Sequence, residues 1–188
     1  MKLSFVSLAL AAAALSPLVA QAQQALVPAQ SEVSCVSRQR GVPVEGKFKT
    51  FSAQVAFDPA KLATSKIAFT VDTGSATLGS RETDAELPKP TWFNVPKFPQ
   101  AQFESTAIKA LGGGKFEVAG KLTIKGNAQN VVVPVALTQS GPTTTATGTL
   151  PIKRLAFKIG ENEWADTSMV ADDVTVKFKL ALTGVNKL

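Results

Sequence analysis

The chain has 188 residues, with 20 Lys or Arg against 14 Asp or Glu and no histidine, so its net charge at pH 7 is +6. This length suits one domain with a sizeable core. The absence of histidine excludes Ser–His–Asp and Cys–His catalytic arrangements and imidazole metal ligands. The basic residues are scattered and do not form runs interleaved with aromatic residues, which argues against nucleic acid as a partner.

Residues 1–22 have the features of a secretory signal peptide. Lys2 precedes an apolar run, and Ala20-Gln21-Ala22 matches an A-x-A cleavage motif. We therefore expect cleavage after Ala22, a periplasmic or secreted protein, and a single domain over residues 23–188. Cys35 is the one cysteine in the sequence and cannot form an internal disulfide. Its apolar strand pattern predicts a small buried side chain.

The rest of the chain shows the alternation of apolar and polar residues that is typical of β-strands, and no convincing amphipathic helix longer than about two turns. In chain order the predicted strands are Glu32–Arg38, Val44–Phe48, Phe51–Asp58, Lys66–Thr73, Ala101–Ala110, Lys115–Lys125, Asn130–Ser140, Thr143–Ile152 and Val174–Thr183. Turns are predicted at Gly41-Val-Pro43, Gly112–Gly114, Gly126-Asn127 and Gly141-Pro142.

The segment from Arg81 to Phe103 interrupts this pattern. Its four prolines exclude a ladder strand, yet it is rich in large apolar side chains. A short helix is predicted over Ser80–Leu87, with Ser80 as its N-cap and Asp84 as a local cap or a partner of Arg81. We interpret the segment as a lid over the open end of a barrel, since long irregular connections in compact domains are usually functional.

These elements predict an all-β fold, an extended antiparallel β-barrel of about eight strands with a short helical, Pro- and aromatic-rich lid. A barrel of about eight strands is either filled by its own side chains or holds one ligand. Strand periodicity does not separate these two outcomes, because both use the same residue types.

A set of ordered motifs resembles one known family. The motifs are S-x-V-x-C at 31–35, G-V-P-V-E-G-K-F at 41–48, F-D-P at 57–59, V-D-T-G-S at 71–75, R-x-x-D-x-x-L at 81–87, W-F-N-V-x-x-F-P at 92–99, F-x-S at 103–105, V-A-G-K-L-T-I-K-G at 118–126 and W-A-D at 164–166. Together they cover essentially the whole mature chain. They resemble the YceI-like family of exported polyisoprenoid-binding proteins, some of whose members are described as bacterial lipocalins.

The resemblance implies a lipocalin-like barrel with an internal tunnel for a long lipid tail, such as that of a polyprenyl phosphate or an isoprenoid quinone. We expect no cofactor. The chain departs from the usual family pattern at Cys35, where phenylalanine is common, and at Gln39, where histidine is common. A smaller side chain at position 35 would widen the tunnel, and the missing imidazole removes any head-group contact it provides.

We select candidate ligand-binding residues by size and apolarity in the strands and the lid. They are Phe48, Phe51, Phe69, Leu78, Leu87, Trp92, Phe93, Phe98, Phe103, Phe116, Leu122, Leu155, Phe157 and Trp164. A charged head group requires a cation at the mouth of the barrel. The candidates for that role are Arg81 and Arg154.

The sequence favours a non-enzymatic, metal-free binding protein. Acidic residues cluster near Trp164, but their spacing matches no Ca²⁺ loop, and no pair of carboxylates has a spacing that singles it out for glycoside hydrolysis.

The first hypothesis for the function is a periplasmic carrier of an isoprenoid amphiphile with transient membrane contact. The alternatives are a scavenger of foreign hydrophobic compounds and a stress-related interaction protein with a filled barrel. The oligomeric state stays open, a dimer included.

Overall fold

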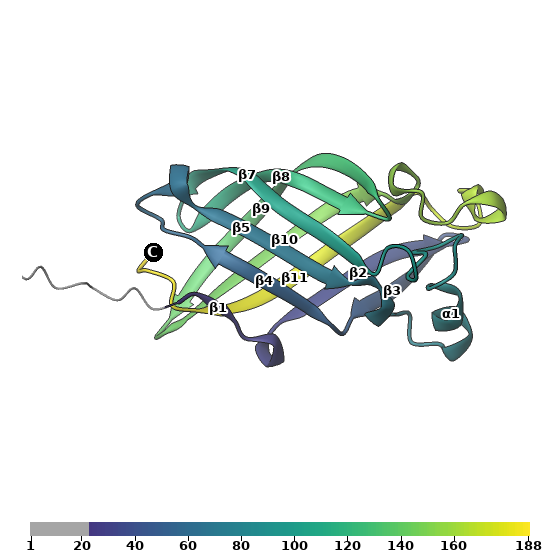
Figure 1. The fold of residues 1–188 in the computed structure, drawn as a ribbon, viewed down its shortest axis with the longest axis horizontal. Coiled ribbons are helices and arrows are strands. Elements are labelled where there is room, and N and C mark those ends of the chain that lie inside the picture. Colours follow the sequence, from purple (N-terminus) through teal and green to yellow (C-terminus); the bar gives the residue numbers. More distant parts are fainter. Residues whose placement is uncertain (1–22) are drawn as a thin grey trace, which may run out of the picture.

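In this computed structural model, residues 23–188 are described, and the predicted signal peptide lies outside them. They form one antiparallel sheet of eleven strands, curled into an elongated open barrel (Figure 1). The strands are β1 (Ala25–Leu26), β2 (Glu32–Gln39), β3 (Val42–Phe48), β4 (Phe51–Ala56), β5 (Lys66–Asp72), β6 (Ala76–Thr77), β7 (Gln100–Gly112), β8 (Lys115–Ile124), β9 (Asn127–Ser140), β10 (Thr143–Lys153) and β11 (Asp173–Thr183).

The helical elements are short and lie in the connections between strands. One α-helix, α1, spans Arg81–Glu86. The 3₁₀ turns are η1 (Pro28–Gln30), η2 (Leu62–Thr64), η3 (Thr73–Ser75), η4 (Arg154–Phe157) and η5 (Asn162–Ala165). The predicted all-β class, the nine long strands and the single short helix are therefore confirmed, and two two-residue strands are added.

Two predicted turns are displaced by one or two residues. The β2–β3 turn lies at Arg40–Gly41, where both residues have positive φ, and Pro43 belongs to β3, in register with Arg38. The β8–β9 turn lies at Lys125–Gly126, so Asn127 begins β9. The strong turn propensity of Pro and Asn is overridden here because the neighbouring residues adopt the left-handed conformation that tight hairpins require.

The strand order is β4-β5-β7-β8-β9-β10-β11-β2-β3-β6, with β1 paired to β11 beside β2. β3 and β4 follow each other in the chain but lie at opposite sides of this order, so within residues 23–188 no ladder joins them. Near the end of β4 the gap is bridged by Gln24. Its side-chain amide donates to the Phe57 carbonyl at 2.6 Å and accepts from the Phe57 N–H at 2.8 Å, which makes it a substitute for a strand residue.

A second discontinuity separates β9 from β10. These strands pair only between Val135–Ser140 and Thr143–Gly148, the half nearest their hairpin. Pro134 and Pro151, at the point of separation and beyond it, have no N–H to donate to a ladder. The element η4 fills the space at the start of β9, where the Asn127 amide donates to the Phe157 carbonyl at 3.2 Å.

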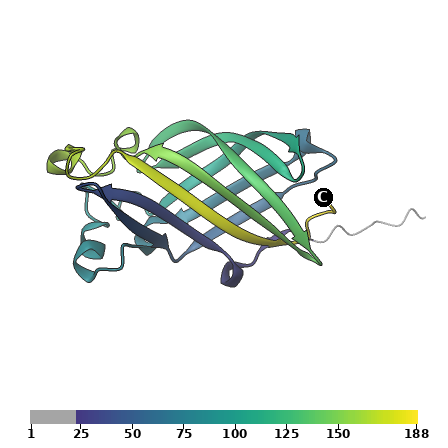
Figure 2. The same cartoon turned by 180° about the vertical axis from the view of Figure 1, so that it is seen from behind.

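The two ends of the barrel differ, as Figures 1 and 2 show. At one end lie the β7–β8 and β9–β10 hairpins and both described termini; we call this the hairpin end. At the other lie α1 and the loop that carries η4 and η5; we call this the lid end. The hairpin end is closed by a buried cluster of Phe57, Phe116, Leu182 and Val185, in which the two Phe rings meet edge to face at 5.4 Å.

Candidate functional site

The interior of the barrel contains a cavity of about 300 Å³. Its wall follows the inward positions of the strands: on β11, every second residue from Val174 to Leu182 contributes to it. At about 3.3 Å per residue these eight steps extend roughly 26 Å along the strand. The cavity is therefore elongated along the barrel.

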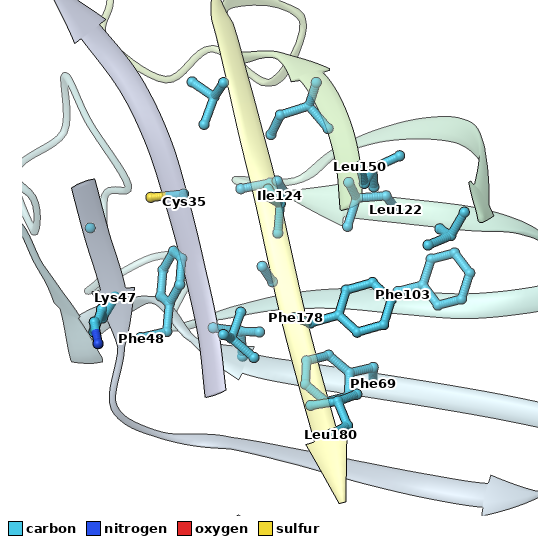
Figure 3. A pocket seen from close by; sticks show the side chains of 18 of the residues that line it. Cys35, Lys47, Phe48, Phe69, Phe103, Leu122, Ile124, Leu150, Phe178 and Leu180 are labelled. Atoms are coloured by element: carbon cyan, nitrogen blue, oxygen red, sulfur yellow. The ribbon is translucent and has the colours of Figure 1, made fainter. Parts of the chain in front are cut away.

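The wall is almost wholly apolar. Figure 3 shows Phe69 of β5, Phe103 of β7 and Phe178 of β11 directed into the same space, together with Leu122, Leu150 and Leu180. Only two of the residues that line the cavity, Lys47 and Arg154, carry a charge. A site of this kind binds by burial of apolar surface and gains its selectivity from a few polar groups.

Two glycines make room for the aromatic rings. Gly148 pairs with Phe178 across β10 and β11, and a Cβ at Gly148 would collide with that ring and with the Pro134 carbonyl. A Cβ at Gly120 would lie 2.5 Å from the Phe103 ring and 2.5 Å from the Glu104 carbonyl. Each ring therefore occupies space that a side chain at the facing glycine would otherwise fill.

The predicted lid closes one end of this cavity. It is a series of tight turns in which the N–H groups of Trp92 and Asn94 donate to the Lys89 carbonyl and that of Phe93 donates to the Leu87 carbonyl. Leu87, Trp92 and Phe93 line the cavity from this side. Thr73 fixes the end of the lid to β5, since its hydroxyl donates to the Phe98 carbonyl at 2.9 Å.

Asp84 fixes the start of the lid, although Ser80 was the predicted cap. Ser80 occupies the N-cap position of α1, but its side chain forms no capping hydrogen bond. The Asp84 carboxylate instead accepts from the Thr77 hydroxyl and the Leu78 N–H, each at 2.6 Å. These two bonds, that from Thr77 first, hold the pKa of Asp84 below its ordinary value. Of the two predicted roles, the structure assigns Asp84 that of a local cap.

Two buried cations hold the lid end together: Lys125 joins the lid to the loop that carries η4 and η5, and Arg154 binds that loop alone. The Lys125 amine donates to the Pro90 carbonyl at 2.6 Å, the Lys158 carbonyl at 2.7 Å and the Glu161 carboxylate at 2.7 Å. Arg154 is 2% exposed. Its five N–H groups donate to the carbonyls of Ala171, Ile159, Gly160, Trp164 and Val170. Burial lowers the pKa of Arg154, and the nearby Asp172 partly offsets this.

The structure brings together nine of the fourteen apolar candidates. Those that line the cavity are Phe48, Phe69, Leu78, Leu87, Trp92, Phe93, Phe103, Phe116 and Leu122. The other five, Phe51, Phe98, Leu155, Phe157 and Trp164, do not contribute to its wall. Trp164 instead packs against the Trp92 ring, with ring centroids 5.5 Å apart. Phe157 is buried in a cluster with Ile124 and Ile159.

The two head-group candidates are placed differently. Arg81 is exposed at the first residue of α1 and does not line the cavity. Arg154 does line it, but all of its donors are already engaged by backbone carbonyls. The geometry thus gives Arg154 a structural role, in which it holds the loop from Ile159 to Ala171 in place.

The candidate set omitted many wall residues that period-2 alternation identifies. They include two large side chains, Phe57 and Phe178, and the smaller valines of β9 and β11. The inward face of β2 adds a polar series, Cys35, Ser37 and Gln39. The Cys35 thiol faces Gly46, its neighbour in register on β3, and burial raises its pKa.

Residues 23–188 contain no group of three acidic or cysteine side chains arranged to hold a metal ion.

Comparisons with known proteins agree with this architecture. The family model described as YceI-like domain matches residues 25–182. Among solved structures, Burkholderia cenocepacia BcnA is 51% identical, with a TM-score of 0.80 over 83% of this chain and 98% of that chain. A polyisoprenoid binding domain from Saccharophagus degradans, implicated in plant cell wall breakdown, is 14% identical, with a TM-score of 0.70 over 86% of this chain and 98% of that chain, and shares the fold.

Curated relatives match over shorter stretches. A UPF0312 protein of Yersinia pestis is 36% identical over 96 residues, which is 51% of this chain and 50% of the relative. One from Vibrio cholerae is 31% identical over 90 residues, 48% of each chain. The chain thus spans about half the length of the curated relatives it matches. The family match over residues 25–182 and the likeness to BcnA show that the chain belongs to the YceI-like domain family.

Proposed function

We propose that this protein binds a long hydrophobic amphiphile with an isoprenoid tail, which it holds inside the barrel and carries between membranes. The observation that supports this most directly is the long apolar cavity, lined by inward side chains of nearly every strand. A binding role also fits the polyisoprenoid binding domain from Saccharophagus degradans, which has the same fold.

The energetics of tail burial are favourable for such a ligand. Each buried CH₂ contributes roughly 0.8 kcal/mol, so about ten methylenes supply about 8 kcal/mol before the cost of association. Because this term is non-directional, the apolar part of the wall selects for length and shape and tolerates different tails. Tight binding then needs no catalytic group and no metal, and we propose a binding protein that is not an enzyme.

We further propose that the protein acts after export, in the periplasm, and that it contacts membranes transiently to load and release its ligand. The sequence features of residues 1–22 support export. Among the described residues no helix is long and apolar enough to cross a membrane.

The test is to purify the mature protein from the periplasm without detergent, measure its mass under native conditions, and identify any extracted lipid. We expect a stoichiometric isoprenoid amphiphile. Two neighbouring residues of β9 provide a matched pair of variants. Val133→Trp places a large ring in the cavity and should abolish lipid binding, whereas Val132→Trp lies on the outer face, where Val132 is 55% exposed, and should retain it.

A lipid-free mass that stays unchanged after polyprenyl phosphates, polyprenols and quinones are added would contradict this function. Equal lipid content in the Val132→Trp and Val133→Trp variants would contradict the assignment of the cavity as the binding site. Circular dichroism of both variants establishes that each retains the sheet, since overpacking alone costs about 1–3 kcal/mol.

A further inference from the structure

Four buried apolar residues form a floor of the cavity at the hairpin end. Phe116 and Leu182 are the inward residues of β8 and β11 nearest this end, and Phe57 continues the inward row of β4. Beyond β11, Gly184 has a φ of 73°, and Val185 packs against the other three residues. All four line the cavity, and each is at most 8% exposed. The cavity is therefore closed at this end by apolar side chains.

Two glutamine side chains hold the backbone of this floor in place. The Gln24 amide group donates to the Phe57 carbonyl and accepts from the Phe57 N–H. The Gln139 amide donates to the Val185 carbonyl at 3.2 Å and to the Thr144 hydroxyl at 3.1 Å. A ligand that reaches this end thus meets a stop of defined position.

The polar residues of the wall lie towards the other end. Of the wall residues with a hydroxyl, amide or charged side chain, only Thr144 belongs to the hairpin end, and it is 0% exposed. The others are Ser37, Gln39, Lys47, Thr73, Thr77 and Arg154. Thr73 and Thr77 bond to the lid segment, and Lys47 is in register with Thr77. Because burying a polar group in an apolar environment is costly, the tail of an amphiphile belongs at the floor and its head towards the lid end.

We propose that this floor sets the longest tail that the cavity holds, so that the protein selects isoprenoid amphiphiles by tail length. The tail terminus lies against Phe57, Phe116 and Val185. A shorter tail buries less apolar surface, and a longer one must overpack the floor or leave isoprene units in water. Affinity therefore rises with each isoprene unit up to a limit and falls beyond it. This proposal rests on the proposed lipid-binding function.

The experiment offers the delipidated mature protein an equimolar mixture of prenols from farnesol to solanesol, which share one alcohol head. Native mass spectrometry identifies the lengths that are bound, and we expect an upper limit. Phe116→Ala deepens the cavity and should raise binding of the first excluded prenol by about ten-fold or more. Val185→Phe raises the floor and should lower binding of the longest accepted prenol by about ten-fold or more. Shifts in opposite directions cannot result from lost stability alone.

Phe157→Ala is the matched control, since Phe157 is as deeply buried as Phe116 but does not line the cavity. It should leave the length limit unchanged. Thermal melting establishes which variants fold, and Val185→Ala is a milder way to deepen the cavity if Phe116→Ala does not. Binding without an upper limit, or a limit that the folded floor variants do not move, would overturn this inference alone. If no prenol of any length binds, the proposed function itself fails.

A prenol with a photoreactive benzophenone at its tail terminus tests the direction of the tail without any substitution. After irradiation of the wild-type complex, peptide mapping should find the label on peptides that contain Phe57, Phe116 or Leu182. Labelling of the lid at Trp92 and Phe93 would show that the tail points away from the floor, and would overturn the proposal.

Discussion

The Lys125 amine lies 2.7 Å from the Glu161 carboxylate and joins the β8–β9 turn to the loop that covers the lid end. The same amine donates to the Pro90 carbonyl of the lid, so one buried cation holds three segments that are more than 30 residues apart in sequence. Lys125 is therefore one of the points at which the lid is fixed to the barrel, in addition to the contacts of Thr73 and Asp84.

We predict that Lys125→Met lowers the free energy of unfolding by about 1–3 kcal/mol, because it removes the donor to the Pro90 and Lys158 carbonyls and the ion pair with Glu161. Hydrogen exchange at Trp92 and Phe93 should increase more than exchange in β10 and β11. Lys121→Met, which changes an exposed lysine on β8, is the control and should change neither quantity measurably. Uniform protection in both variants would show that Lys125 does not fix the lid.

Gly148→Ala should narrow the cavity. The added methyl group meets the Phe178 ring and the Pro134 carbonyl, so the ring must turn towards the centre of the barrel. We expect a loss of about 1–3 kcal/mol in stability and weaker binding of long-tailed ligands. The double variant Gly148→Ala, Phe178→Leu should recover most of the binding, which a double-mutant cycle measures. Additive losses would refute a direct contact between the two positions.

The thiol of Cys35 should react slowly. Burial raises its pKa, so at pH 8 less of it is thiolate than in free cysteine. We expect alkylation by iodoacetamide, followed by mass spectrometry, to be about ten-fold slower or more than for free cysteine, and slower still with lipid bound. Val132→Cys in a Cys35→Ser background supplies an exposed thiol on the sheet and should react at an ordinary rate. Rapid reaction of Cys35 would show that solvent reaches the cavity freely.

The anchoring of the lid by Asp84 should depend on pH. Since its pKa is lowered in the folded state, ionised Asp84 stabilises the fold above the ordinary value of about 3.9, and this contribution is lost as the pH falls through the folded pKa. Asp84→Asn should therefore lower the melting temperature at pH 7, and the difference from wild type should close in acid. Glu82→Gln, on the exposed side of α1, is the control. A difference independent of pH would contradict this role.

The alternation of residue types predicts most of the fold and much of the cavity wall. On β5 and β11 the inward residues are those that period-2 patterning places on one face, since one face of the sheet is buried and register is strongly specified. Choosing candidates by ring size was less reliable. Phe51 stacks on Phe69 at 5.9 Å without reaching the cavity, and Phe98 lies over Gly126 at the lid.

The anchors of the lid end could not be predicted from sequence patterns. Lys125 has the sequence context of an ordinary hairpin turn, and two of its three partners are backbone carbonyls, which carry no residue signature. Arg154 was assigned to a ligand head group because an arginine beside apolar residues suggests a binding cation. Its five carbonyl partners exist only after the loop has folded around it.

The missing ladder between β3 and β4 has a mechanical consequence. A closed barrel, in which every strand is paired on both sides, can change its circumference only by breaking the backbone hydrogen bonds between two strands. Here the circumference is interrupted, and near Phe57 the opposing edges are joined by the paired hydrogen bonds of one glutamine side chain. Widening of the barrel near Phe57 would therefore cost the two hydrogen bonds of Gln24 and side-chain contacts, whereas widening between two paired strands would break a backbone ladder.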